Sequence, residues 1–231
     1  MSAWKRKIQS SLKENIEKVG LSANYASIAT VKPNNMPAVR TVVMRDFAGE
    51  HHTDNTGWNS DLLVVITDKR TDKINELKQN PNIELNWYMN GTMEQFRVVG
   101  TVDMIEKNYD SKKLEHLDSH FEQVETGERD PKNLALEMFL QQQKSATTNK
   151  FNWQAERLRH FYQFGTHMRA QMTSDPSKPL DINEVDPKDG WFKNDQLQES
   201  LEEAFENFVL LVITVTSVRH WSPCTGTKSL L

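Results

Sequence analysis

The segment that most constrains this chain is Pro37 to Phe47, PAVRTVVMRDF, a run rich in β-branched residues with an arginine towards each end. A strand repeats every two residues, so Arg40, Val42 and Met44 share one face and Thr41, Val43 and Arg45 share the other. Each face then carries one cation beside apolar groups, which suits an anionic ligand with a flat, partly apolar body. The alternative is a half-buried strand with two solvated arginines, and this segment alone leaves both open.

Other segments also have the composition or alternation of strands. They are Asn24–Val31, Leu62–Thr67, Ile83–Met89, Met93–Ile105 and Phe208–Val218. Lys32–Asn35 and the Asn90-Gly91 pair supply turn residues for hairpins, and Gly100 inside a strand indicates a bulge or a close backbone approach. Hairpin links favour a small antiparallel barrel, mainly β with helices, over a parallel sheet.

Several segments have the pattern of helices. The first 19 residues place Trp4, Ile8, Leu12 and Ile16 at a spacing of four among charges, which predicts an amphipathic helix and not a secretory signal. Further helices are expected over Tyr109–Val124, Asn133–Lys144, Trp153–Phe164 and Gln196–Asn207, with an exposed excursion over Thr173–Asp189. We expect one domain over 1–231, with a barrel core at 20–105, a helical region at 106–207 and a final strand at 208–218.

Composition excludes several classes of function. The formal net charge of −4 argues against general nucleic-acid binding, because phosphate neutralisation needs a basic surface. No run approaches the roughly 18 apolar residues of a membrane span. The glycines form neither a dinucleotide nor a phosphate-loop motif, and no cluster has metal-ligand spacing. The single cysteine, Cys224, fits a reducing compartment, so we expect the cytosol, and a nuclear location is equally compatible.

A second cationic segment follows the Leu62–Thr67 run. It contains Arg70, Thr71 and Lys73, and Thr71 is a candidate N-cap for a helix that ends at Asn80. A helix start with free backbone N–H groups beside two cations is suited to binding an anion. An ordinary capped surface helix is the alternative.

Three blocks in series carry a resemblance to a known family. They are RTVVMRDF, VVITDKRTDKINELKQNPNIELNWYM and EQFRVVGTV. In this order and at these intervals they resemble the pyridoxamine 5′-phosphate oxidase family of FMN-binding split barrels, in particular an oxidase-related branch with the patterns T-D-x-R-[ST]-x-K and E-Q-F-R. The resemblance covers residues 20–105 and, more loosely, the final strand.

The resemblance implies a six-stranded antiparallel Greek-key split barrel that forms a homodimer and binds two FMN molecules between its subunits. It implies that Arg40 contacts the FMN phosphate and ribityl chain, that Thr41, Val42 and Val43 run along the flavin, and that Arg45 lies near the substrate. It further implies cofactor contacts from Thr67, Arg70, Thr71, Lys73 and Gln95. Arg169 is an additional candidate for a phosphate contact, with a helix-surface arginine as its alternative.

The implied function is that of an FMN-dependent oxidoreductase acting on a small molecule, similar to the pyridoxamine and pyridoxine 5′-phosphate oxidases that form pyridoxal 5′-phosphate. The sequence also departs from those oxidases. Asp72 stands where they usually have arginine, the Y-x-x-x-R-P-x-x-S cluster is absent, and no arginine or histidine follows Trp221. The alternative is therefore a flavin-binding carrier, sensor or degenerate paralogue without this oxidase activity.

Overall fold

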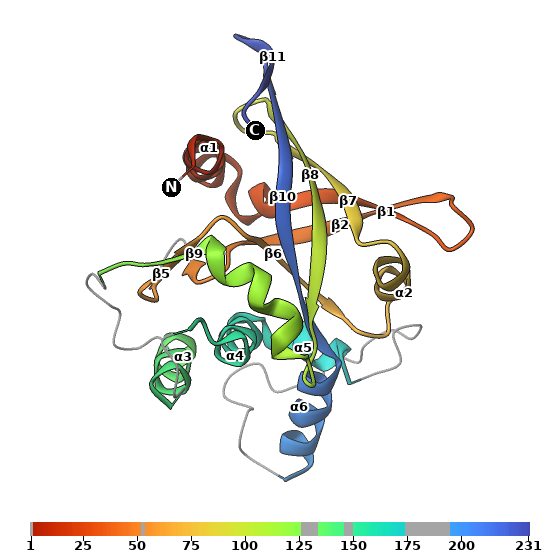
Figure 1. The fold of residues 1–231 in the computed structure, drawn as a ribbon, viewed down its shortest axis with the longest axis vertical. Coiled ribbons are helices and arrows are strands. Elements are labelled where there is room, and N and C mark those ends of the chain that lie inside the picture. Colours follow the sequence, from red (N-terminus) through yellow and green to blue (C-terminus); the bar gives the residue numbers. More distant parts are fainter. Residues whose placement is uncertain (1, 52–53, 126–133, 146–149, 174–194) are drawn as a thin grey trace.

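The computed structural model of the chain describes residues 2–51, 54–125, 134–145, 150–173 and 195–231. Six antiparallel strands close into a barrel: β1 (Tyr25–Val31), β2 (Pro37–Phe47), β6 (Leu63–Asp68), β7 (Asn82–Met89), β8 (Glu94–Ile105) and β10 (Phe208–Ser222). Their order is β10-β6-β2-β1-β7-β8, and β8 pairs back to β10, while β11 (Gly226–Ser229) extends the free end of β10 (Figure 1). The predicted six-stranded antiparallel barrel is confirmed.

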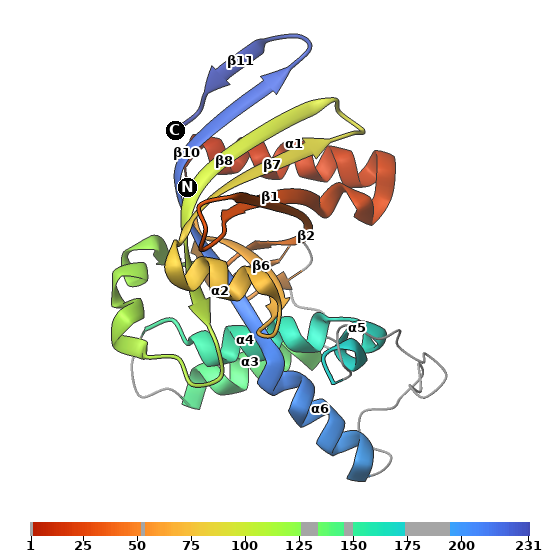
Figure 2. The same ribbon diagram turned by 90° about the vertical axis from the view of Figure 1, so that its right-hand side faces the viewer.

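Tight turns join the predicted hairpins. Between β1 and β2, Asn35 takes a positive φ of 61° and donates its backbone N–H to the Lys32 carbonyl. Asparagine tolerates this left-handed backbone better than most residues. Between β7 and β8 the loop runs from Asn90 to Met93, so the Asn-Gly pair does mark the hairpin. The β7–β8 and β10–β11 hairpins extend together from one end of the molecule (Figure 2).

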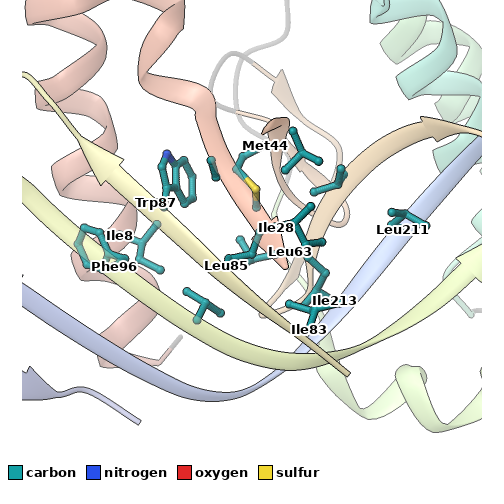
Figure 3. Packing of buried hydrophobic residues seen from close by; sticks show 14 of the residues in the cluster. Ile8, Ile28, Met44, Leu63, Ile83, Leu85, Trp87, Phe96, Leu211 and Ile213 are labelled. Carbon is teal, nitrogen blue, oxygen red and sulfur yellow. The ribbon is translucent and has the colours of Figure 1, made fainter. Parts of the chain in front are cut away.

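The barrel core is built from the inward residues of alternating strands. Along β7 the buried residues are Ile83, Leu85, Trp87 and Met89, as the sequence alternation predicts. Helix α1 (Ala3–Val19) adds Trp4, Ile8 and Leu12 to the same core, and Figure 3 shows Ile8 among the strand residues. Strand β10 is buried on both faces because Leu211 and Ile213 enter this core while Leu210 and Val212 enter a second one. This double burial explains its continuous apolar run.

Gly100 marks a close approach of β8 to β10. A Cβ at this position would overlap the backbone carbonyl oxygen of Thr214. The pairing register of β10 with β8 shifts between Val215 and Ser217, directly beside this contact. Both features predicted for an in-strand glycine are therefore present.

The remaining elements surround the barrel. They are the 3₁₀ helices η1 (Gly20–Asn24) and η2 (Ser111–His120), the helices α2 (Asp72–Gln79), α3 (Leu134–Ser145), α4 (Trp153–Gln163), α5 (Thr166–Gln171) and α6 (Asp195–Asn207), and the short strands β3 (Glu50–His51), β4 (Asp54–Asn55), β5 (Trp58–Ser60) and β9 (Phe121–Gln123). The helix expected over Tyr109–Val124 is wrong in its second half, because Phe121–Gln123 pairs with β5 as a strand. The excursion after Thr173 lies outside the described residues.

The second core lies between the barrel wall and the helices that follow β8. It joins Leu62, Phe139 and Phe161 to the outer side of β10. Two arginines of α4 are fully buried in this region: Arg157 donates to the carbonyls of Phe205 and Phe208, where α6 ends, and Arg159 pairs with Glu156. In the described part of the chain, no helix is both long and apolar enough to cross a membrane.

Candidate functional site

Arg40 lies against a buried polar floor formed by β1 and α2. Its Nη2 atom donates to Glu76 Oε2 at 2.5 Å, and its Nη1 atom donates to the hydroxyl of Thr30. Thr30 in turn donates to the same Glu76 oxygen at 2.5 Å. The side chain of Glu76 is 5% exposed, whereas that of Arg40 is 24% exposed. The guanidinium therefore remains accessible above a floor that fixes two of its nitrogens.

Lys73 lies beside Arg40 in the first turn of α2. Its Nζ atom donates to the hydroxyls of Thr67, at 2.8 Å, and Thr71, at 3.0 Å. Burial lowers the pKa of the Lys73 ammonium, and the Arg40 guanidinium lowers it further, while nearby carboxylates partly oppose both effects. The structure thus brings together Arg40, Thr67, Thr71 and Lys73, four of the residues predicted from the sequence, and we call this group the cationic cluster.

The start of α2 contributes backbone donors to the cationic cluster. Thr71 occupies the N-cap position, as predicted, but its hydroxyl donates to the carbonyl of Asp68 and makes no side-chain cap hydrogen bond to the helix. The first amides of a helix carry a partial positive charge that favours an anion. Two cations, two hydroxyls and this helix start together suit a phosphate group.

The Arg70 side chain contacts Asp68 and backbone carbonyls near the end of α5. Its Nε and Nη2 atoms contact both carboxylate oxygens of Asp68, at 2.6 to 3.1 Å, and Nη2 also donates to the carbonyls of Gln171 and Met172. The side chain therefore ties the turn before α2 to the end of α5. A phosphate contact from Arg70 stays a prediction, and it would require these bonds to be exchanged.

Arg45 is a desolvated cation on the outer face of β2. Its guanidinium lies over the ring of Phe164, 5.4 Å from the centroid, and no hydrogen bond partner reaches its buried Nε atom in the described part of the chain. Burial lowers the pKa of Arg45, an effect that the nearby Tyr25 only partly opposes. A desolvated arginine without a carboxylate partner is suited to an anionic ligand.

The residues between Arg40 and Arg45 divide between the two faces of β2. Thr41 is exposed and Val43 half-buried on the outer face, whereas Val42 is 7% exposed in the barrel core. The side chains of Thr41 and Val43 can therefore line a ligand on the outer face. Val42 could reach such a ligand only through its main chain.

Gln95 lies apart from the cationic cluster, since β1 and β7 separate β2 from β8 in the sheet. It donates to Asn86 at 2.7 Å and lines a cavity of about 410 Å³. The other lining residues are Tyr88, Arg97, Arg219, His220, Trp221 and Thr227. A single chain does not bring Gln95 and the cationic cluster into one pocket among the described residues.

Arg169 is a residue of α5, and its side chain contacts the C-terminal end of α4. It is 4% exposed and its Nη1 atom donates to the carbonyls of Phe161, at 3.2 Å, and Tyr162, at 3.1 Å. Burial lowers the pKa of Arg169 to about 10. Its observed contacts cap a helix, and the predicted phosphate contact stays untested.

Sequence reasoning missed two residues of the cationic cluster's floor, Thr30 and Glu76. Glu76 stands three residues after Lys73 on a helix, so both side chains lie on one face of α2. This spacing is the feature of the sequence that could have indicated Glu76. Thr30 gave none, because its role depends on the pairing of β1 with β2, which places Ile28 opposite Arg40.

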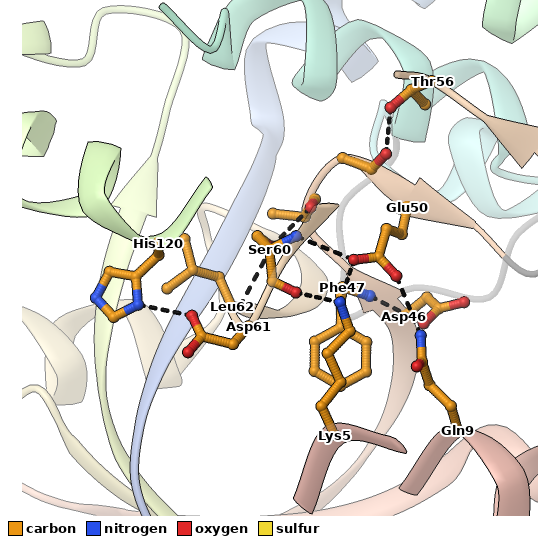
Figure 4. Close-up of polar contacts among 12 residues, drawn as sticks. Lys5, Gln9, Asp46, Phe47, Glu50, Thr56, Ser60, Asp61, Leu62 and His120 are labelled. Atoms are coloured by element: carbon orange, nitrogen blue, oxygen red, sulfur yellow. Dashed lines mark hydrogen bonds and ion pairs between the residues drawn. The ribbon is translucent and has the colours of Figure 1, made fainter. Parts of the chain in front are cut away.

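A second polar cluster fixes α1 to the short strands β3 and β5. Lys5, 2% exposed, donates to Glu50 and to the Ser60 carbonyl, and Gln9 donates to Glu50 at 3.1 Å (Figure 4). Beside it, His120 and Asp61 are joined at 2.6 Å on the wall of a cavity of about 150 Å³. The Lys5 ammonium is paired within the protein, so we assign this cluster to helix docking.

Comparison with known proteins connects this geometry with a family. Residues 1–106 match the model described as pyridoxamine 5′-phosphate oxidase, FMN-binding domain. Pyridoxine/pyridoxamine 5′-phosphate oxidase 2 of Arabidopsis thaliana is 39% identical over 94 residues, which are 40% of this chain and 43% of the plant protein. The corresponding oxidase of Pelagibacter ubique is 30% identical over 82 residues, 36% of this chain and 34% of that protein. The matches thus span less than half of either relative.

Solved structures share the fold over nearly the whole chain. A pyridoxamine 5′-phosphate oxidase-related, FMN binding protein from Nostoc punctiforme aligns with a TM-score of 0.59 at 24% identity, covering 99% of this chain and 89% of that one. PhzG from Burkholderia lata aligns with a TM-score of 0.50 at 10% identity, covering 97% and 89%. At these identities the likeness concerns the fold. Residues 1–106, just under half of the chain, contain Arg40, the Thr67–Lys73 turn and Gln95 and match the FMN-binding domain family of pyridoxamine 5′-phosphate oxidase.

Proposed function

We propose that this protein binds FMN and acts as an oxidoreductase on a small molecule. The observation that supports this most directly is the cationic cluster, which lies within the segment that matches the family model. An FMN phosphate is a dianion, and the cluster offers two cations, of which Arg40 alone is paired with a carboxylate among the described residues. The Lys73 ammonium donates hydrogen bonds only to hydroxyls in the described structure, so an incoming phosphate would give it an anionic hydrogen-bond partner.

The outer face of β2 offers a wall for the flavin ring. Thr41 and Val43 point outward beside Arg45, and the exposed Tyr25 lies opposite Val43 on β1. Bound FMN would supply the redox chemistry, accepting electrons from the substrate. The protein's own residues would orient the two molecules and limit the access of water.

Arg45 determines the class of substrate that we propose. Its desolvated guanidinium over Phe164 favours a planar substrate with an anionic group, a description that pyridoxamine and pyridoxine 5′-phosphate fit. Formation of pyridoxal 5′-phosphate would follow from oxidation of either compound.

A second candidate function is flavin binding without this oxidase activity. It is favoured by the contacts of Arg70 and Arg169, which are directed to Asp68 and to backbone carbonyls. Fewer cations are then available for a phosphorylated substrate. Such a protein would serve as a flavin carrier or sensor, or be a degenerate paralogue.

We also propose a homodimer that completes the flavin site. The outer sheet face carries exposed apolar side chains, namely Tyr25, Val39, Tyr88 and Trp221. The cavity containing Gln95 opens on this face. A partner subunit that covers this face would place its own Gln95 cavity against β2 of the first chain. The predicted FMN contacts of Gln95 and of the cationic cluster, which are separated within one chain, would then lie in one site.

The experiment that tests the proposed function is a flavin titration of the purified protein. The visible spectrum shows whether flavin is bound, and FMN is then added to the flavin-free form of the wild type and of Arg40→Ala/Lys73→Ala. We expect the double variant to lose about 3 kcal/mol of binding free energy, the scale of two charge-assisted contacts. Lys78→Ala, which removes an exposed cation of α2, is the matched control. Turnover of pyridoxamine 5′-phosphate separates the two candidates, and unchanged FMN affinity in the double variant would contradict the site.

A further inference from the structure

We infer that Glu76 is the positioning residue of the phosphate site: it holds the Arg40 guanidinium in the orientation that an incoming phosphate meets. The inference rests on the proposed FMN function and extends it to a residue that itself would not touch the ligand. The structural basis is the closed contact between three side chains from three elements, Arg40 on β2, Thr30 on β1 and Glu76 on α2.

The exposure of the three side chains shows which of them form the floor and which one a ligand can contact. Thr30 is 2% exposed and the Glu76 side chain 5% exposed, so both lie beneath Arg40. Arg40, at 24%, is the only one of the three that solvent or a ligand reaches readily. Glu76 therefore acts on the site through Arg40.

The donor inventory of arginine shows what this arrangement leaves available. A guanidinium has five N–H donors in a rigid plane. One N–H of Nη1 and one of Nη2 are used by Thr30 and Glu76. Three donors remain, and their direction is fixed because the plane is held at two points. An arginine without this floor would lose more rotamer entropy on binding a phosphate.

The charge of Glu76 is maintained at neutral pH. Burial by itself would raise the pKa of this carboxyl, but hydrogen bonds from Thr30 and Arg40 outweigh it and lower the pKa below its ordinary value. The Arg40 guanidinium lowers the pKa of Lys73, and the Glu76 carboxylate opposes that effect. Glu76 thus allows two cations to be held close together before the anion arrives.

The test compares FMN with riboflavin, which lacks the phosphate, on the wild type and on two variants of Glu76. Glu76→Leu removes both the charge and the acceptor, and we expect FMN affinity to fall about 10-fold or more while riboflavin affinity changes less than about 2-fold. Glu76→Gln keeps an acceptor for Arg40 and Thr30, so we expect FMN affinity within about 3-fold of the wild type. Glu106→Leu, which removes the partner of Lys78 at the exposed side of α2, is the matched control.

Each outcome bears on one of the two claims. Equal losses for FMN and riboflavin in Glu76→Leu, or no loss for either, would overturn the positioning role, because only an effect specific to the phosphate acts through Arg40. If Glu76→Leu does not fold, Thr30→Val removes the other half of the floor and must itself weaken FMN more than riboflavin. Failure of the wild type to bind FMN would instead overturn the proposed function. That result is read from the wild type alone, so it is distinguishable from an effect of the Glu76 variants.

Discussion

The guanidinium of Arg45 lies 5.4 Å from the centroid of the Phe164 ring, joining the outer face of β2 to the helical half of the chain. Arg157, also on that side, is more deeply buried but donates to the carbonyls of Phe205 and Phe208. Each side chain keeps one buried nitrogen that reaches no partner in the described structure, Nη1 of Arg157 and Nε of Arg45. They differ because Arg157 also donates to backbone carbonyls, whereas the described residues provide no hydrogen bond to the Arg45 guanidinium.

This difference predicts that the two arginines contribute unequally to stability. Arg157→Leu should lower the free energy of unfolding by about 3 kcal/mol, because buried carbonyls at the end of α6 lose their donor. Arg45→Leu should leave it within about 1 kcal/mol of the wild type, or raise it, because a desolvated cation is removed. Urea unfolding of both variants measures these free energies. If Arg45→Leu lowers the free energy of unfolding as much as Arg157→Leu does, Arg45 has a structural role.

Lys73 should make FMN binding sensitive to alkaline pH. Its pKa is lowered by burial and by Arg40, so the free protein loses this proton below the ordinary value of 10.5. The protonated ammonium attracts the phosphate, hence affinity should fall as pH rises through the lowered pKa. Above about pH 7.5 the ligand phosphate is already a dianion and contributes no change of its own.

The matched variant for this measurement is Lys73→Arg. A guanidinium stays charged across the range, so the affinity of Lys73→Arg for FMN should remain nearly constant between about pH 8 and 10.5. Fluorescence titration with FMN at successive pH values gives both curves. A parallel decline in the two proteins would exclude Lys73 as the titrating group.

The barrel could be predicted from the sequence because its signals are local. The alternation of β7 and the continuous apolar run of β10 indicate burial directly. The turn residues after β7 indicate the hairpin with β8. The helix expected over Tyr109–Val124 failed at Phe121, where pairing with β5 overrides local helix propensity. Local propensity contains no information on a partner strand whose paired residues lie 61 to 65 positions away in the sequence.

The sequence predicted which residues could form the site, but not the hydrogen-bond partners of their side chains. Arg40, Arg70 and Arg169 have the same side chain, and the sequence could not tell that the first would lie on a carboxylate floor, the second against Asp68 and the third against helix carbonyls. The partners of Arg40 come from β1 and α2 and those of Arg169 from α4, so they are set by tertiary packing. Asp68, the partner of Arg70, ends β6 two residues earlier in the chain. Only the spacing of Lys73 and Glu76 on α2 was visible in advance.

Glu94 should account for part of the stability that the protein loses in acid. Burial alone would raise the pKa of its carboxyl, but contacts from Lys7, at 2.6 Å, and His220, at 2.9 Å, help lower it from 4.5 to about 2. A carboxyl with a lowered pKa in the folded state contributes stability that is present above about pH 4.5 and lost as pH falls towards 2. Glu94→Gln should therefore be less stable by about 2 kcal/mol at pH 7, with a flatter stability curve between pH 4.5 and 2. Thermal unfolding across this range measures it, and curves that stay parallel would contradict the role of this ion pair.

The exposed sheet face provides the last prediction, since Val39 on β2 is 69% exposed beside the proposed flavin wall. If this face joins two copies of the chain, Val39→Asp places two buried carboxylates near the interface and should shift the protein to a monomer in sedimentation velocity. FMN affinity should fall with it, because the partner's Gln95 cavity is then withdrawn from the β2 face. Leu21→Asp, at an equally exposed apolar position on η1 and outside the sheet, should change neither property. A Val39→Asp monomer that binds FMN as tightly as the wild type would show that a single chain forms the complete flavin site.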